Sequence, residues 1–256
     1  MPPRFPKASK IALKNPPLEL VVCQLRFPLL INLNAHNPPT TFQKELKKTY
    51  PIAGSGETTT LQLTASVGTP IGRSQAPFWF FEDRNSEWHV SIAPNFLSLE
   101  AKKYKDFAEF LKRFQEVLAI AIKCYDIEVR ERLGLRYLNR ISETKESKLP
   151  DRWCEKLQSE ILPLRNLRNA DEPQLTKLES RFMFGENILA VKSQFADSAF
   201  PGIDVDELLL DFDCYDPQRR DLTDIDDRLN EFKGICYDAF RWAIHDVITY
   251  FDRAET

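Results

Sequence analysis

Glycine, histidine and methionine are scarce in this sequence, and long apolar runs are missing. The chain has 8 glycines, 3 histidines and 2 methionines, against 17 prolines. No segment approaches the roughly 18–20 consecutive apolar residues that span a bilayer. The opening residues MPPRFPKASK lack the apolar core of a signal peptide. We therefore expect a cytoplasmic protein with no membrane partner.

Motifs for metal or nucleotide binding are also missing. His36, His89 and His245 form no HExxH pattern, and neither GxxxxGK[ST] nor GxGxxG occurs. The stretch AGSGETTT has the composition of a phosphate loop without its pattern, and it predicts a flexible turn before a strand. The 5 cysteines are scattered, odd in number and without a CxxC pair, which favours buried reduced thiols over a disulfide scaffold. No cofactor is expected.

The charge balance argues against a protein that binds nucleic acid through its overall charge. Charged residues make up 29% of the chain, but the formal net charge is −3. Proteins that bind nucleic acid in this way are usually clearly basic. A local basic surface is still compatible with this balance, because the field near a surface follows the nearby charges.

Hydrophobic periodicity predicts an α+β fold made of two similar halves, residues 1–145 and 146–256, closely packed as one unit. In the first half, strands accompany an amphipathic helix near 104–127, with Asp106 as its N-cap. In the second half, three strands precede an amphipathic helix at about 222–251. We expect each half to be an antiparallel sheet backed by its long helix. The polar stretch TKESKLPD marks the boundary, and a short helix is expected at 152–162.

One strand carries an unusual number of arginines. Alternate residues of a strand point to opposite sides, so RERLGLRYLNR places four arginines on one face: Arg130, Arg132, Arg136 and Arg140. Guanidinium groups suit phosphates, nucleotides and acidic protein segments because they donate paired hydrogen bonds. On this interpretation, replacing Arg132 and Arg136 with Glu weakens capture of a partner and leaves the fold largely intact.

A structural alternative exists for the arginine face. In LLLDFDCYD, Asp211 and Asp213 share one strand face, and this acidic face could pair with the arginines across a sheet. The same two carboxylates are also weak candidates for a divalent metal site of a phosphodiesterase. No third ligand follows at a diagnostic spacing, so a metal site is the less favoured interpretation.

Aromatic residues are concentrated in PFWFFEDRNSEWHV, which predicts a hairpin. Consecutive aromatics on a strand must point to both faces, and Trp79 with Phe81 then requires a cover. A helix of the same chain, a partner protein or stacked nucleic-acid bases could supply it. We count both residues as candidate binding residues.

Four segments together resemble a sporadically distributed bacterial family of similar length, whose members carry no assigned biochemical activity. These segments are NPPLELVVCQLRFP, LSLEAKKYKDFAEFLKRFQEVL, RLGLRYLNRI and LLLDFDCYD, and GLRYLNRI is the most specific of them. The resemblance implies cargo of mobile or antiviral-defence loci, such as accessory proteins of CRISPR or restriction systems. It supplies no catalytic residues.

The sequence therefore predicts a binding module that is not an enzyme. We expect it to dock another protein of the same defence locus through the arginine face and the aromatic strand. Sequence-independent binding of RNA or single-stranded DNA by the arginine face is the first alternative, and a metal-dependent phosphodiesterase is the second.

Overall fold

The computed structural model describes residues 5–63, 70–142, 157–161, 175–196 and 207–251. The chain divides into two compact units. Unit 1 comprises Met1–Val21, Gly134–Asp216 and Asp227–Thr256, and unit 2 comprises Val22–Leu133 and Pro217–Asp226. Each unit is described below by itself.

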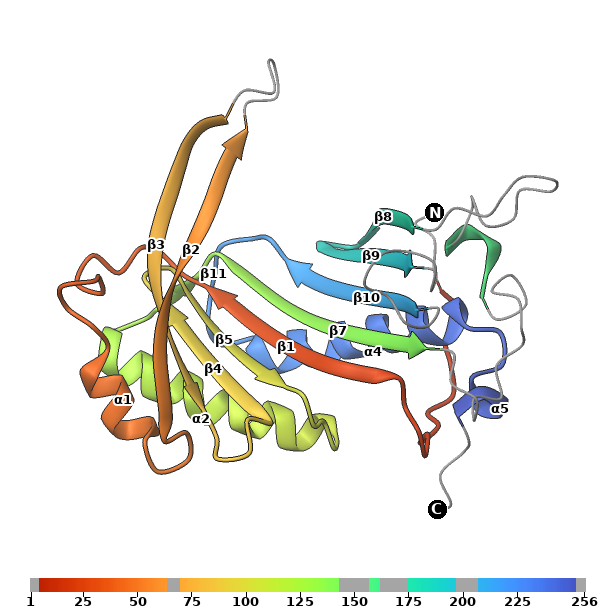
Figure 1. The fold of residues 1–256 in the computed structure, drawn as a ribbon, viewed down its shortest axis with the longest axis horizontal. Helices are drawn as coiled ribbons and strands as arrows, with labels where there is room; N and C mark the ends of the chain where they lie inside the picture. Colours follow the sequence, from red (N-terminus) through yellow and green to blue (C-terminus); the bar gives the residue numbers. More distant parts are fainter. Residues whose placement is uncertain (1–4, 64–69, 143–156, 162–174, 197–206, 252–256) are drawn as a thin grey trace. The chain divides into compact units, whose positions relative to one another are not determined.

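Strands dominate the described residues. They are β1 (Leu18–Arg26), β2 (Ile52–Leu63), β3 (Pro70–Glu82), β4 (Trp88–Ala93), β5 (Phe96–Ala101), β6 (Val129–Arg130), β7 (Arg132–Ser142), β8 (Leu175–Phe184), β9 (Asn187–Ala196), β10 (Glu207–Asp216) and β11 (Arg220–Asp221). The helices are α1 (Thr40–Leu46), α2 (Phe107–Tyr125), α4 (Ile225–Ala243) and α5 (Val247–Phe251), with a 3-10 turn η1 at Ser159–Ile161. Figure 1 shows these elements.

The expected pair of separate sheets, each backed by its own long helix, is wrong. Nine strands form one antiparallel sheet in the order β2-β3-β4-β5-β1-β7-β10-β9-β8, and β11 pairs with β6 in a second, two-stranded sheet. Strands β1 and β7 each contribute residues to both units. Alternation within a strand shows which residues are buried but does not identify its neighbours. A continuous ladder through β1 and β7 was therefore not visible in the sequence.

Unit 2 packs α1 and α2 against one face of its strands. The buried residues of α2 recur at helical spacing: Phe107, Phe110, Phe114, Val117, Leu118 and Ala121. Phe110 lies 6.0 Å from Trp88 of β4, measured between ring centroids. Phe42 of α1 is fully buried and meets the Phe81 ring of β3 edge-on at 5.7 Å. These contacts fix both helices on the strands, as the apolar periodicity predicted for α2.

Unit 1 buries every second residue of β10. Leu208, Leu210, Phe212 and Cys214 are fully buried. Strands β8 and β9 form a hairpin around Gly185, whose φ of 62° suits glycine. The apolar stripe of α4 packs in the same core, with the Cys236 thiol 3.7 Å from the Phe212 carbonyl oxygen. The strands expected in this region are confirmed.

Several local expectations change. The stretch AGSGETTT lies within β2, so the turn expected there is wrong. The arginine segment is confirmed as extended, but it breaks at Glu131 into β6 and β7. The last helix ends at Ala243, and a separate α5 follows. The proposed boundary and most of the helix expected at 152–162 lie outside the described residues.

None of the helices in the described ranges combines the length and apolar composition that crossing a bilayer requires.

We expect the Asp106 cap to stabilise α2 measurably. Its carboxylate accepts a hydrogen bond from the Glu109 backbone N–H at 2.9 Å. Asp106→Ala should lower the free energy of unfolding by about 1 kcal/mol in urea titrations. Asp106→Asn keeps an acceptor and serves as the control, with a change of only a few tenths of a kcal/mol. Equal losses in both variants would contradict a capping role.

Candidate protein-docking site

A loop of unit 2 exposes two large apolar side chains. The docking loop, defined as Pro28–Pro39, connects β1 to α1, and within it Leu29 is 66% and Ile31 80% exposed. Leu33 of the same loop is buried and anchors it to the unit. Large exposed aliphatic groups next to a hollow are typical of interaction surfaces.

Asparagine side chains hold the docking loop in shape. Asn34 Nδ2 donates to the Ile31 carbonyl oxygen at 3.1 Å, and Asn34 Oδ1 accepts from the backbone N–H groups of His36 and Asn37 at 3.0 and 3.1 Å. Asn37 Nδ2 donates to the Asn32 carbonyl oxygen. These side-chain bonds add to the backbone bridge between Asn34 and Asn37 and to the hydrogen bond from the Leu30 N–H to the Pro94 carbonyl oxygen. Ile31 is therefore presented on an internally bonded loop.

The docking loop borders a hollow of about 620 Å³, here called the loop hollow. Its walls are the docking loop, the start of α1 and the end of α2, and it is lined by Leu29, Leu30, Ile31, Asn32, Leu33, Asn37, Pro38, Pro39, Thr40, Thr41, Cys124, Tyr125 and Asp126. This volume lies in the range typical of ligand sites. Apolar walls with a few amides and hydroxyls suit an apolar group that carries some polar atoms.

The charge of the loop hollow is negative. Asp126 is the charged residue among the described residues that line it. It ends α2 with a left-handed backbone, φ 52°, and its own N–H bonds back to the Ile122 carbonyl oxygen. The C-terminal end of a helix carries partial negative charge from its free carbonyl groups. A cationic group is therefore favoured at this end of the hollow.

A second hollow, the edge groove, lies between β2 and α1. It measures about 190 Å³ and is lined by Pro38, Pro39, Thr40, Gln43, Ala53, Gly54, Ser55, Trp79 and Phe81. The two hollows share the turn at Pro38–Thr40. Small side chains at Ala53 and Ser55 leave the Trp79 ring partly uncovered, which creates the groove.

The aromatic candidates Trp79 and Phe81 are both on the helix side of unit 2. Phe81 is only 2% exposed and is covered by Phe42 of the same chain. Trp79 is half-buried and lines the edge groove. The aromatics of the opposite sheet face are Phe78 and Phe80, which the sequence analysis did not select. Phe80 stacks on His89 at 5.1 Å.

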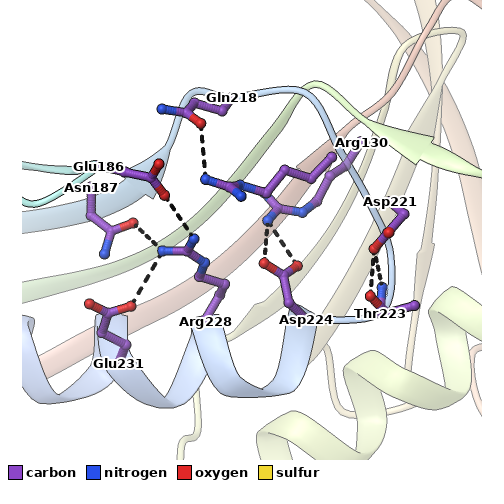
Figure 2. A network of polar contacts seen from close by, with 10 residues as sticks. Arg130, Glu186, Asn187, Gln218, Asp221, Thr223, Asp224, Arg228 and Glu231 are labelled. Atoms are coloured by element: carbon purple, nitrogen blue, oxygen red, sulfur yellow. Dashed lines mark hydrogen bonds and ion pairs between the residues drawn. The ribbon is translucent and has the colours of Figure 1, made fainter.

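The candidate arginines of unit 2 are engaged by the chain itself. The Arg130 side chain is fully buried, and its Nη2 donates to both carboxylate oxygens of Asp224 at 2.9 and 3.1 Å (Figure 2). Arg132 is half-buried, and its Nη1 lies 3.5 Å from Gln24 Oε1. Arg130 is therefore not available to an external anion.

The candidate arginines of unit 1 form ion pairs with acidic side chains. Arg136 makes a bidentate contact with Asp211, at 2.7 Å from Nε and 2.8 Å from Nη2. Arg140 bridges Glu19 and Glu207 at 3.0 and 2.7 Å, and the hydrogen bond to Glu19 is the main cause that raises the pKa of this guanidinium. The pairing of Arg136 with Asp211 supports the structural alternative over anion binding.

This pairing also bears on metal chemistry. Asp211 is 5% exposed, and its carboxylate is occupied by Arg136. Asp213 lies on the same face of β10, opposite Ala190 of β9. Among the described residues, no group of three His, Cys, Asp or Glu side chains could hold a metal ion. Asp211 is therefore engaged within unit 1, and the phosphodiesterase hypothesis gains no support.

One arrangement in unit 2 has the residue types of a catalytic triad. His89 Nδ1 lies 3.0 Å from Glu82 Oε1, and His89 Nε2 lies 2.9 Å from Ser91 Oγ. However, Ser91 is 6% exposed and sits in β4, which is paired on both sides by β3 and β5. Backbone N–H groups of such a strand are used by the ladder, so they do not form an oxyanion hole. The contacts instead fix the imidazole ring beside Phe80.

Sequence reasoning missed the docking loop. Its signal was the segment PLLINLNAHNPP, which places aliphatic residues between prolines directly after a strand. Whether Leu29 and Ile31 join the core depends on what lies next to them in space, and periodicity does not report that. Asn34 and Asn37 were likewise recognisable as loop-forming residues, but their partners were not.

Comparison with protein-family models and with curated proteins gives no match to this chain. The family resemblance inferred from the sequence therefore stays a prediction.

The Arg136–Asp211 contact revises the expected effect of charge reversal. Arg136→Glu places a second carboxylate against the buried Asp211, so it should lower the free energy of unfolding by roughly 1–3 kcal/mol in denaturant titrations. Arg136→Gln removes the ion pair without adding repulsion and should cost less. A Glu variant as stable as the wild type would mean that this contact is not formed in solution.

A pH dependence follows from Glu82. The hydrogen bond from His89 is the main cause that holds the pKa of the Glu82 carboxyl below its ordinary value of 4.5. A lowered folded-state pKa stabilises the protein above pH 4.5, and this stabilisation is lost as the pH falls through the folded-state pKa. Thermal melts of wild type and Glu82→Gln should therefore differ at pH 6, and the difference should shrink as the pH falls below 4.5. A constant difference across this range would refute the assignment.

Proposed function

We propose that this protein is a non-enzymatic binding module that docks a segment of another protein in the loop hollow of unit 2. The observation that carries the proposal is the exposure of Ile31, 80%, and of Leu29, 66%, beside a hollow of about 620 Å³. Exposed aliphatic groups that border a concave surface gain free energy when a partner covers them.

The internal bonding of the docking loop supports this role. A flexible loop loses conformational entropy when a partner orders it, and this loss weakens binding. Asn34 and Asn37 already hold the backbone around Ile31, so less ordering is required on binding. Pre-organisation of this kind increases affinity because the cost of ordering the loop has already been met on folding.

The chemistry of the hollow defines the partner. Its apolar walls favour a segment with aliphatic or aromatic anchors. Asp126 and the C-terminal end of α2 favour a lysine or arginine near one of these anchors. The part of the partner segment that enters the loop hollow is therefore apolar and basic, not acidic.

The other functional hypotheses have less support. Nucleic-acid binding relied on four arginines, and three of them are paired in the structure with Asp211, Asp224, Glu19 and Glu207. The link to an antiviral-defence locus depends on the family resemblance alone and stays a prediction.

The proposal is tested by selecting binders from a phage-displayed library of random linear peptides on the wild-type protein. Enriched peptides should combine apolar anchors with a lysine or arginine. Ile31→Asp should weaken their binding about tenfold or more, since an exposed anchor becomes a charge. Met183→Asp is the matched control, because Met183 is 55% exposed but belongs to unit 1.

A second variant tests the charge of the hollow. Asp126→Asn removes the carboxylate, and asparagine tolerates the left-handed backbone at this position. It should weaken lysine-containing peptides by a few-fold and leave peptides without a cation unaffected. Enrichment of acidic peptides, or equal loss in the Ile31 and Met183 variants, would refute docking at the loop hollow.

A further inference from the structure

Strand β2 is an edge of the sheet, and its outer side has no strand partner among the described residues. It pairs with β3 along its whole length, from Ile52 opposite Glu82 to Leu63 opposite Pro70. Strand β3 pairs with β4 only over Trp79–Glu82, so the rest of the β2–β3 ribbon extends past β4 (Figure 1). The outer backbone groups of β2 can therefore accept another strand.

The two edge strands of the sheet, β2 and β8, differ in how well their residues protect against the addition of another strand. Strand β8 carries exposed charges at alternate positions: Lys177, Glu179 and Arg181. Strand β2 is 12 residues long, contains no proline, and Glu57 is its single charged residue. Charges and prolines are the usual protection of a strand edge against added strands. This protection is present on β8 and nearly missing on β2.

A side-chain site lies directly along the start of β2. Ala53, Gly54 and Ser55 form one wall of the edge groove, and Gln43 of α1 contributes to the other. Trp79 provides an apolar surface within the groove. An edge strand with a neighbouring helix and an apolar hollow between them is the arrangement that receives extended peptides by strand addition.

The opposite face of β2 is closed by aromatic rings. A Cβ atom on Gly54 would collide with the Phe80 ring, and one on Gly56 would collide with the Phe78 ring. These rings therefore occupy the space that side chains at both positions would need. An added strand finds the edge groove on the helix side, so those of its alternate residues that point to this side are favoured to be apolar.

Charges along β2 indicate the polarity of the added segment. Lys47 and Lys48 are exposed in the turn just before β2, and Glu57 is exposed five residues after its start. A segment lying along this edge would be matched by an acidic residue near the lysines and a basic residue near Glu57. The basic end agrees with the cation preferred by the loop hollow, which shares the Pro38–Thr40 turn with the edge groove.

We propose that β2 binds an extended segment of the partner protein as an additional strand, with one apolar side chain of that segment in the edge groove. This inference rests on the proposed function and specifies how the partner docks. The backbone of β2 supplies hydrogen bonds that are independent of the partner's sequence, and the groove supplies the sequence preference.

Backbone N-methylation of a selected peptide tests the strand addition directly. Peptides are taken from the library selection on the wild-type protein, and each residue in turn is N-methylated. In an added strand, alternate N–H groups point toward β2, so methylation should weaken binding about tenfold at every second residue. Methylation at the residues between them should change binding by less than about twofold. Loss without this period of two would overturn the proposal.

A protein variant locates the added strand. Ser55→Lys introduces an edge-protecting charge at an exposed position of β2, and it should weaken peptide binding about tenfold. Met183→Lys places the same charge on β8 and should bind like the wild type. Hydrogen exchange should show that peptide binding protects amides within residues 52–57. Thermal melts should show that both variants remain folded.

The outcomes separate this inference from the proposed function. If Ile31→Asp abolishes binding while Ser55→Lys and N-methylation have no effect, docking in the loop hollow stands and strand addition is wrong. If no peptide is enriched on the wild-type protein, both proposals fail. If sedimentation shows a dimer whose contact protects β2 without peptide, a second copy of the chain occupies the edge, and the partner segment is ruled out.

Discussion

Phe42 is the contact on which both hollows of unit 2 depend. Its ring is fully buried, meets Phe81 edge-on at 5.7 Å and lies 6.1 Å from the Tyr125 ring. Phe81 lines the edge groove and Tyr125 lines the loop hollow. One aromatic side chain of α1 therefore fixes the Pro38–Thr40 turn between a strand and the end of a helix. A turn held in this way keeps two neighbouring concave surfaces at a constant spacing.

Charge is used mainly within the molecule. Arg130, Arg136 and Arg140 all pair with acidic side chains, and the partners of Arg136 and Arg130 come from distant parts of the chain. A buried guanidinium that is paired and hydrogen-bonded fixes local geometry, and the desolvation of both groups limits its net contribution to stability. In the proposed function, recognition relies on shape and apolar contact at the docking loop and the edge of β2.

The sequence predicted local structure better than it predicted the architecture. Asp106 and the apolar spacing of α2 were sufficient to place that helix, because capping and amphipathic periodicity act over a few residues. The alternation in β10 predicted that the face with Asp211 could pair with the arginine face, but it did not identify which arginine is the partner. Strand neighbours are set by long-range pairing, so the single nine-stranded sheet could not be read from periodicity.

The candidate site shows the same limit. Trp79 was recognised as an aromatic in need of a cover, and it lines the edge groove. The exposure of Ile31 and the accessibility of β2 depend on which surfaces other elements leave open. The sequence does contain one indication of the exposed edge: β2 has a single charged residue, whereas β8 has charged residues at alternate positions. This difference becomes meaningful only once both strands are known to be sheet edges.

Because residues 54 and 56 are glycines, the backbone at the start of β2 has more conformational freedom than it would have with β-branched residues at these positions. Glycine loses more conformational freedom than other residues when a strand becomes ordered. The Phe78 and Phe80 rings lie where side chains at these glycines would be, so larger residues cannot stiffen the segment. The pairing with β3 instead holds this segment extended. The start of β2 therefore depends on its neighbouring strand, and not on its own side chains, for its shape.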